Sequence, residues 1–286
     1  MVKICDIDNY PSENEEKYKE HFAKFKYPLH LFQKWAIEGI VEGQHVLVTA
    51  PTGSGKSLPA EFCLDFFVKQ GKKVIYCSPI KALSNQKFDD FSKKYQHISV
   101  GIITGDIKTN PDADVLIMTT EILLNKLYQL KSGKTEILLN KDKSGGTLIK
   151  NPSTSFDMDI EHELGCVIFD EIHMINDPSR GHVWENSIMM LPKNVQIVGL
   201  SATLDKPERF AEWLETRGEK LETLEKTVYL TKRFNRAVPL THYAFITATG
   251  VGKVFKDKST QEEIKRNIDK PFIIQDASGV FNDTNY

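Results

Sequence analysis

The residues best suited to chemistry form a glycine-rich loop, APTGSGKS, at positions 50–57. An apolar run precedes the loop and a helical stretch follows it. In that setting backbone N–H groups and a helix N-terminus surround phosphates. We expect Lys56 to contact the β- and γ-phosphates of a nucleotide and Ser57 to ligate Mg²⁺. The strict pattern has glycine at the position of Ala50, a mild departure. The expected nucleotide-binding residues of the loop are Thr52, Gly53, Ser54, Gly55, Lys56 and Ser57.

Two adjacent carboxylates end a later apolar run, in the segment VIFDEIH at positions 167–173. Asp170 can hold Mg²⁺ through the water shell of the ion, since Mg²⁺ in proteins keeps several waters. Glu171 is placed to orient and deprotonate an attacking water molecule. An apolar run that ends in Asp-Glu is weak evidence alone, but it is strong evidence downstream of a phosphate-binding loop.

A pair of hydroxyls follows a third apolar run, in the tripeptide Ser201-Ala202-Thr203. Hydroxyls at a strand end can bond the 170–173 segment and sense the γ-phosphate of a nucleotide. A helix N-cap explains the same tripeptide equally well. The tripeptide is therefore informative only through its position after the other two motifs.

Short apolar runs alternate with helical stretches in the order needed to position these motifs. The runs lie at 45–50, 73–78, 100–104, 114–120, 165–171 and 195–203. This alternation predicts βαβ units and a parallel sheet covered on both faces. The expected fold class is α/β, a doubly wound parallel sheet of the RecA-like, P-loop NTPase type. Ligands of such sheets bind at the carboxyl ends of the strands, where the three motifs fall.

The composition of the 286 residues is typical of an ordinary soluble globular protein, with 40% apolar residues, 27% charged residues and a net charge of -2. Nucleic-acid binding would therefore depend on a local basic surface or on backbone amides. The four cysteines, Cys5, Cys63, Cys77 and Cys166, form no CxxC pair, which argues against a zinc site. The polar, acidic N-terminal residues lack the charged-then-apolar pattern of a signal peptide, and no apolar run reaches the roughly 18 residues of a membrane span. We expect a cytoplasmic or nuclear protein without a membrane partner.

The chain divides by composition into three parts. Residues 1–26 are expected to be a charged lead-in, with regular structure beginning at Tyr27. Residues 27–230 are expected to form the α/β domain, interrupted by a Lys-, Ser- and Gly-rich surface insertion at about 131–161. The insertion is either a solvated loop or a basic loop that contacts nucleic acid. Residues 231–286 are expected to form an irregular or β-rich extension leading toward a second domain.

The ordered motifs resemble those of superfamily 2 DExH-box helicases, and more narrowly the superkiller-type RNA helicases that feed the RNA exosome. The resemblance covers about residues 27–260 around the insertion, and SPIKALSNQK is its most subgroup-specific piece. The residues that carry it are Phe32-Gln33, the loop at 50–57, SPIKALSNQK at 78–87, Thr104-Gly105-Asp106, MTTEIL at 118–123, FDEIH with Asp177, Arg180-Gly181 and Trp184-Glu185, SATL at 201–204, and VPLTHY at 238–243.

The resemblance implies a role for each matched residue. Gln33 would recognise adenine, although it could also be a surface helix residue. Ser201 and Thr203 would complete the ATP site, and His173 would join Lys56, Asp170 and Glu171 in catalysis by linking the Mg²⁺ site to the hydroxyls. The residues expected to hold one RNA strand by its phosphates are Pro79, Lys81, Thr104, Gly105, Thr119 and Thr120. Lys81 could instead be a solvated lysine, and the two adjacent threonines could be helix caps. Arg180 and Glu185 are expected to form a structural ion pair.

The sequence departs from the family pattern in one respect. The family motor uses two RecA-like domains, and the arginine-finger motif of the second domain is absent from these residues. An arginine finger is worth about 10³–10⁵ in the rate of phosphoryl transfer. We therefore expect this chain alone to bind ATP–Mg²⁺ weakly and to hydrolyse ATP barely. A second RecA-like domain or a partner chain would complete it, and an RNA-degradation complex is a candidate partner.

The leading hypothesis is the first motor domain of an ATP-dependent RNA helicase that unwinds RNA in the 3′-to-5′ direction. Its substrates would be ATP with Mg²⁺ and single-stranded RNA, bound without base readout. One alternative is a DNA helicase of the same subgroup. The other is a nucleotide-gated binding module that does not hydrolyse ATP.

Overall fold

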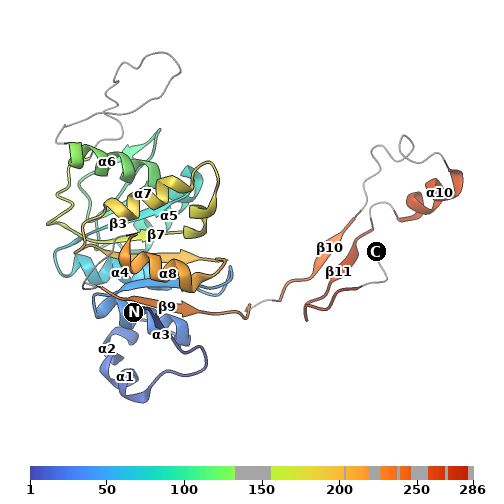
Figure 1. The fold of residues 1–286 in the computed structure, drawn as a ribbon, viewed down its shortest axis with the longest axis horizontal. Helices are drawn as coiled ribbons and strands as arrows, with labels where there is room; N and C mark the ends of the chain where they lie inside the picture. Colours follow the sequence, from blue (N-terminus) through green and yellow to red (C-terminus); the bar gives the residue numbers. More distant parts are fainter. Residues whose placement is uncertain are drawn as a thin grey trace, which may run out of the picture. The chain divides into compact units, whose positions relative to one another are not determined.

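The computed structural model describes residues 1–132, 156–202, 204–218, 226–236, 239–245, 257–267 and 270–282. The chain divides into two compact units, Met1–Asn235 and Arg236–Tyr286. Both units are drawn in Figure 1. None of the helices in the described part of the chain has the length and apolar character needed to span a bilayer.

A nine-stranded sheet organises the described part of the first unit, with the strand order β1-β9-β2-β8-β7-β3-β6-β4-β5. Its strands are β1 (Lys3–Ile4), β2 (His45–Thr49), β3 (Lys73–Ser78), β4 (Val100–Ile103), β5 (Lys108–Thr109), β6 (Val115–Thr119), β7 (Leu164–Phe169), β8 (Gln196–Ser201) and β9 (Val228–Lys232). Neighbouring strands pair in parallel except β4 and β5, which are antiparallel. The carboxyl ends of the parallel strands therefore meet at one edge of the sheet.

Helices cover both faces of this sheet (Figure 1). The helices in the described part of the first unit are α1 (Ser12–Lys17), α2 (Lys19–Phe22), α3 (Leu31–Val41), α4 (Leu58–Val68), α5 (Lys81–Lys94), α6 (Thr120–Ser132), the 3₁₀ helix η1 (Ile172–Asn176), α7 (Gly181–Met190) and α8 (Pro207–Thr216). Alternate residues of one strand enter opposite cores: Val167 of β7 packs with the α6–α8 side, and Ile168 packs with the α3–α5 side. Such alternation is what a strand buried on both faces requires. The predicted doubly wound α/β fold is confirmed.

The first 26 residues are part of the domain, so the prediction that regular structure begins at Tyr27 was wrong. β1 pairs in parallel with β9 at the edge of the sheet, and α1 and α2 follow it. Tyr10 and Tyr18 are buried. A strand of two residues carries no periodic pattern, and its partner lies more than 200 residues away, so local sequence analysis missed it.

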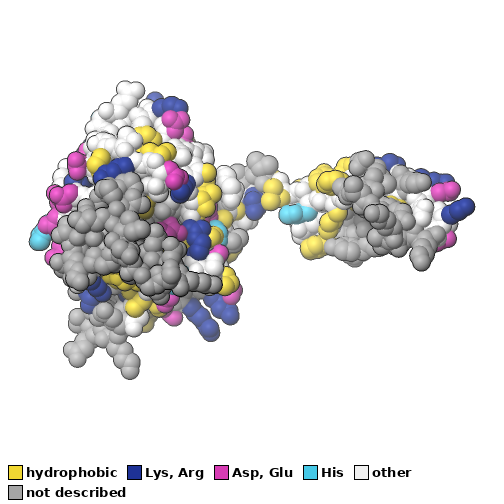
Figure 2. Space-filling model, turned by 90° about the horizontal axis from the view of Figure 1, so that it is seen from above, with side chains coloured by type: hydrophobic (Ala, Val, Ile, Leu, Met, Phe, Trp, Pro, Cys, Tyr) yellow, Lys and Arg dark blue, Asp and Glu magenta, His cyan; other side chains and the backbone are white. Residues whose placement is uncertain are grey.

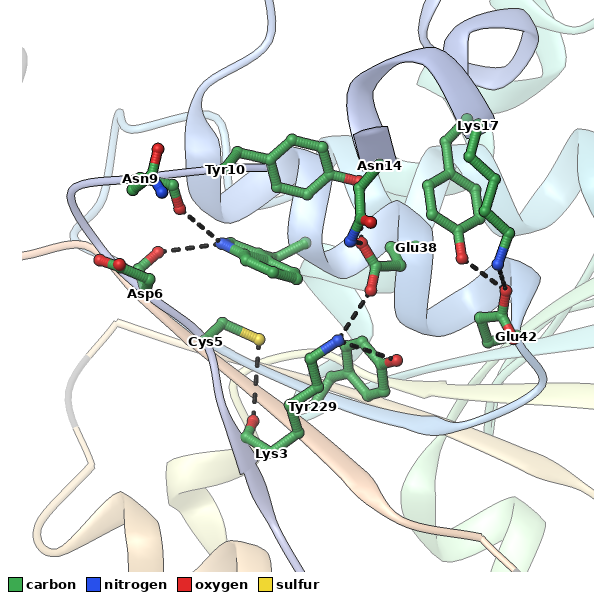
Figure 3. A network of polar contacts seen from close by, with 12 residues as sticks. Lys3, Cys5, Asp6, Asn9, Tyr10, Asn14, Lys17, Glu38, Glu42 and Tyr229 are labelled. Carbon is green, nitrogen blue, oxygen red and sulfur yellow. Dashed lines mark hydrogen bonds and ion pairs between the residues drawn. The ribbon is translucent and has the colours of Figure 1, made fainter. Parts of the chain in front are cut away.

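Polar contacts attach this N-terminal segment to α3. The carboxylate of Glu38 is buried and accepts hydrogen bonds from Lys3 Nζ (2.8 Å), Tyr10 Oη (2.9 Å) and Asn14 Nδ2 (3.0 Å). The indole N–H of Trp35 donates to the carbonyl oxygen of Asp6 (3.0 Å). Figure 3 shows Lys3, Tyr10 and Asn14 gathered around the side chain of Glu38. The buried carboxylate is thus compensated by three donors, and the segment holds α3 against the sheet.

The remaining parts of the prediction concern the insertion and the C-terminal extension. Residues 133–155 of the expected insertion lie outside the described residues. Its final part, from Phe156 to Ile160, places buried side chains in the core and so belongs to the domain. In the second unit, β10 (His242–Ala244) and β11 (Phe272–Gln275) pair as antiparallel strands, and α10 (Lys258–Asn267) precedes β11.

Candidate functional site

The glycine-rich loop joins β2 to α4 at the carboxyl end of β2. Gly53 (φ +82°) and Gly55 (φ +84°) both adopt the left-handed conformation that favours glycine. A β-carbon added to Gly55 would lie 2.7 Å from Gln33 Nε2, whereas one on Gly53 would meet open space. The Ser54 hydroxyl donates to the carbonyl oxygen of Pro51 at 2.6 Å and stabilises the turn. The expected nucleotide-binding residues of this loop directly precede α4, whose N-terminus favours anions.

Gln33 fastens the start of α3 to this loop. Its Nε2 donates to the carbonyl oxygen of Gly55 at 3.0 Å, and its Oε1 accepts from the backbone N–H of His30 at 2.9 Å. The residue is only 3% exposed, so the alternative of a surface helix glutamine was wrong. Gln33 is therefore in direct contact with the loop that we expect to hold phosphates.

A cavity of about 340 Å³ lies between the N-terminal segment, the start of α3 and the end of β9. It is lined by Ile7, Asp8, His30, Leu31, Phe32 and residues 232–235. The guanidinium of Arg233 lies 5.8 Å from the centroid of the Phe32 ring. An aromatic ring with a guanidinium beside it offers planar surfaces for stacking. Sequence analysis did not single out Arg233, since no local motif marks it.

The two adjacent acidic residues follow the last residue of β7. The Asp170 N–H donates to the carbonyl oxygen of Cys77 at 2.9 Å, which extends the pairing of β7 with β3 by one residue. Asp170 Oδ2 accepts from the Tyr76 hydroxyl at 2.6 Å, and Oδ1 accepts from the Glu171 N–H at 3.0 Å. Glu171 has φ +50°, a conformation that is uncommon for residues other than glycine. Such backbone strain is concentrated at functional sites.

Side chains from the predicted motifs form one continuous polar chain. Lys56 Nζ lies 2.6 Å from Glu171 Oε1, and Glu171 Oε2 lies 3.3 Å from His173 Nδ1. His173 Nδ1 is in turn 3.4 Å from the Ser201 hydroxyl. The loop, the end of β7 and the end of β8 are therefore joined at one place. Thr203, which we also expected here, lies outside the described residues.

Two oxygen donors at this site fit a magnesium ion. Asp170 is a carboxylate with 6% exposure at the strand end, and Ser57 lies directly before α4. Oxygen ligands are those that Mg²⁺ prefers, with waters and phosphates completing the shell. Within the described residues, no group of three or more His, Cys, Asp or Glu side chains could hold a metal ion. One carboxylate and one hydroxyl suit an ion whose shell is completed by waters and phosphates.

The residues expected to hold a nucleic-acid strand lie at the carboxyl ends of β3, β6 and β4, which are adjacent in the sheet. Lys81 begins α5, and its Nζ lies 2.5 Å from Asp106 Oδ2. The Thr104 hydroxyl is buried and accepts the N–H of Ile107 at 3.2 Å, so it is committed to a turn. Thr119 and Thr120 are also buried.

The other two predicted strand-holding residues differ in exposure. Pro79 is buried and Gly105 is exposed. Of the six predicted strand-holding residues, Lys81 and Gly105 are therefore the exposed ones. Figure 2 shows lysine and arginine side chains interspersed with aspartate and glutamate over the visible face of the first unit, as the small net charge leads one to expect.

The predicted ion pair between Arg180 and Glu185 was wrong, because Arg180 instead connects these loops. Its Nη2 donates to the carbonyl oxygen of Pro79 at 2.8 Å and lies 2.5 Å from Glu121 Oε1. Its guanidinium also lies 5.5 Å from the centroid of the Trp184 ring. Glu121 precedes Arg180 by 59 residues, so local spacing could not identify the pair.

Comparison with known proteins adds independent information. A family model described as DEAD/DEAH box helicase matches residues 30–210. The chain is 39% identical over 237 residues to the antiviral helicase SKI2 of Saccharomyces cerevisiae, covering 83% of this chain and 16% of that protein. It is 37% identical to superkiller complex protein 2 of Homo sapiens, covering 90% of this chain and 16% of that protein. It is 36% identical to the exosome RNA helicase MTR4 of Homo sapiens, covering 78% and 18%. This chain spans less than a fifth of the length of these relatives.

Solved structures with a similar fold are also helicases. The Mycobacterium smegmatis helicase Lhr bound to ssDNA and AMP-PNP superimposes with a TM-score of 0.55 at 23% identity, covering 91% of this chain and 32% of that chain. The DUF1998 helicase MrfA bound to DNA superimposes with a TM-score of 0.54 at 16% identity, covering 84% and 32%. At these identities the likeness supports the fold alone.

Proposed function

This chain belongs to the DEAD/DEAH box helicase family, and on that premise we propose that its first unit is the nucleotide-binding half of an ATP-dependent RNA helicase motor. One observation carries the proposal. Lys56, Glu171, His173 and Ser201 come from separate segments and form a continuous set of contacts at the carboxyl edge of the sheet. A phosphate bound in the loop would contact Lys56, the first residue of this set.

The proposed roles follow from the chemistry of each group. Lys56 would contact the β- and γ-phosphates, while Ser57 and Asp170 would hold Mg²⁺, which supplies charge neutralisation to the phosphates. Glu171 would accept a proton from the attacking water. His173 and Ser201 would keep Glu171 oriented and would couple the position of its side chain to the end of β8. Thr203 remains a proposed member of this group.

We propose that the base of the nucleotide binds in the cavity of about 340 Å³ at the start of α3, which is lined by Phe32, the residue before Gln33. Phe32 and Arg233 offer planar surfaces to a purine, and the contact of Gln33 with Gly55 would couple base recognition to the phosphate loop. We therefore propose that ATP is preferred over nucleotides that lack the adenine amino group. Replacement of Gln33 by alanine would reduce that preference.

Single-stranded RNA is the proposed polymer substrate. Lys81, Gly105 and the backbone around Pro79, Thr104, Thr119 and Thr120 would contact sugar and phosphate without reading bases. Two relatives at 36% and 38% identity are named RNA helicases, the exosome RNA helicase MTR4 of Homo sapiens and a DExH-box ATP-dependent RNA helicase of Arabidopsis thaliana, which favours RNA over DNA. A second RecA-like domain and an RNA-degradation complex are the proposed partners, in the cytoplasm or the nucleus.

The test is nucleotide binding and hydrolysis by the pure chain, with and without single-stranded RNA, beside a Lys56→Ala variant. We expect binding of Mg²⁺–ATP that Lys56→Ala abolishes, with very slow turnover until a second RecA-like domain is restored. Equal nucleotide binding by the variant and the parent chain would contradict the assignment of the site. Once the motor is complete, stronger stimulation of hydrolysis by single-stranded DNA than by RNA would favour the DNA alternative.

A further inference from the structure

One buried hydroxyl next to the acidic pair has no role in the proposal above. Tyr76 lies in the middle of β3, and its side chain has 0% exposure. Its ring packs edge-on against Phe91 of α5, with the ring centroids 5.5 Å apart. Its hydroxyl is 2.6 Å from Asp170 Oδ2, a residue 94 positions later in the chain.

The hydroxyl of Tyr76 can act only as a donor toward the carboxylate of Asp170, because an ionised carboxylate accepts hydrogen bonds and a phenol carries its proton at neutral pH. The other carboxylate oxygen, Oδ1, accepts the N–H of Glu171 at 3.0 Å. One donor on each oxygen fixes the plane of the carboxylate. Burial strengthens this restraint, since a carboxylate without partners in a site with 6% exposure would be costly.

We propose that Tyr76 is a positioning residue for the magnesium ion of this site, because its hydroxyl orients the Asp170 carboxylate toward the phosphate loop. This inference rests on the proposed function, in which Asp170 helps to hold Mg²⁺. Groups that orient a metal-holding side chain typically change metal affinity by 10–100-fold when they are removed. Tyr76 itself is fully buried, and its hydroxyl contacts the Asp170 carboxylate. Its loss should therefore weaken metal binding while leaving the packing of β3 intact.

The substitution Tyr76→Phe removes the hydroxyl and keeps the ring against Phe91. A matched control is Tyr95→Phe, because the Tyr95 hydroxyl also donates to a carboxylate, Glu61 Oε2 at 3.0 Å, and its ring also packs edge-on against Phe91. Mn²⁺ is a suitable probe, since it accepts the same oxygen ligands as Mg²⁺ and is detected by electron paramagnetic resonance. The titration uses the full chain with a non-hydrolysable ATP analogue at saturating concentration.

We expect the dissociation constant of Mn²⁺ in the nucleotide complex to rise about 10-fold in Tyr76→Phe and to stay unchanged in Tyr95→Phe. In an Asp170→Asn background, adding Tyr76→Phe should cause no further loss. Wild-type Mn²⁺ binding by Tyr76→Phe, while Asp170→Asn weakens it, would overturn the inference and leave the proposed function standing. An equal effect of Tyr76→Phe in both backgrounds would also overturn it. If Asp170→Asn itself leaves Mn²⁺ binding unchanged, the proposed metal site fails, and the role of Tyr76 fails with it.

Discussion

Lys56 Nζ and Glu171 Oε1 lie 2.6 Å apart although 115 residues separate them in the chain. The pair joins the phosphate loop to the end of β7, and both side chains are mostly shielded, with exposures of 9% and 26%. A phosphate in the loop would compete with Glu171 for the same ammonium group. The contact is therefore one that nucleotide binding must rearrange, and it links occupancy of the loop to the position of the proposed general base.

Replacing Glu171 by glutamine should strengthen nucleotide binding and stop turnover. The neutral amide holds Lys56 less strongly, so we expect several-fold tighter binding of Mg²⁺–ATP, measured by titration with a fluorescent analogue. Loss of the proposed base should lower hydrolysis in the complete motor by about 10²–10⁴-fold.

Glu163→Gln is a matched control for Glu171→Gln, since Glu163 pairs with Lys73 (3.1 Å) at the opposite end of β7. This variant should bind and hydrolyse nucleotide like the parent chain. Unchanged hydrolysis by Glu171→Gln in a complete motor would exclude Glu171 as the base. A complete parent motor that never hydrolyses ATP would favour a nucleotide-gated binding module.

Replacing Arg180 by lysine should weaken the binding of single-stranded RNA while leaving nucleotide affinity unchanged. Arg180 Nη2 reaches both the Pro79 carbonyl and Glu121, and an ammonium group lacks the planar geometry of the guanidinium. We expect roughly 10-fold weaker RNA binding in fluorescence anisotropy, the effect of losing one charge-assisted hydrogen bond. Arg209→Lys, at an exposed position of α8, should bind RNA normally. Parallel losses of RNA and nucleotide affinity in Arg180→Lys would show a general structural role instead.

Replacing Gly55 by alanine should impair nucleotide binding beyond its effect on stability. The substitution costs about 1–2 kcal/mol of backbone strain at φ +84°. Its β-carbon would lie 2.7 Å from Gln33 Nε2, so the Gln33 side chain would have to move. Gly71→Ala introduces similar strain at φ +70°, with no atom within 4 Å of the new carbon. Gly55→Ala should lose at least as much thermal stability as Gly71→Ala, and only Gly55→Ala should bind nucleotide at least 10-fold more weakly. Equal nucleotide affinities would contradict the proposed importance of the contact with Gln33.

The stability of the domain should fall as the pH drops below about 6.5 because of His45. His45 is 2% exposed, and its Nδ1 accepts the N–H of Ile197 at 3.0 Å. Burial, with the positive charges of Arg217 and Lys226, holds the pKa of His45 well below its usual value of 6.5. The folded state keeps the ring neutral while the unfolded chain takes up a proton. This contribution is therefore fully present above pH 6.5 and declines by up to about 1.4 kcal/mol per pH unit below it.

Urea denaturation at pH 7.5, 6.5 and 5.5 measures this effect, with His45→Gln as the comparison. The free energy of unfolding of the parent chain should fall more steeply between pH 6.5 and 5.5 than that of the variant. Some slope should persist in His45→Gln, because burial also lowers the pKa values of His21 and His30. Identical slopes for the two proteins would show that His45 is protonated to the same extent in the folded and unfolded states.

The fold class, the family and the local setting of the main motifs could all be predicted from the sequence. The phosphate loop and the Asp-Glu pair follow the apolar runs that form β2 and β7, and Ser201 is the last residue of β8. In a parallel sheet the carboxyl ends of strands share one edge, so motifs that end strands converge whatever the strand order. The proximity of Lys56, Glu171, His173 and Ser201 was therefore foreseeable, and the matching family model confirms the predicted resemblance.

The tertiary structure decided which groups support these motifs. The contacts of Tyr76 with Asp170 and of Arg180 with Glu121, and the pairing of β1 with β9, join residues that no local period or spacing relates. Each depends on the order of strands in the sheet and on side chains meeting across it, which are set by packing over the whole domain. The motifs are visible in short stretches of sequence because a loop or a strand end is formed by consecutive residues. The residues that support the motifs could not be predicted from the sequence, because burial and hydrogen bonding between distant segments exist only once the chain has folded.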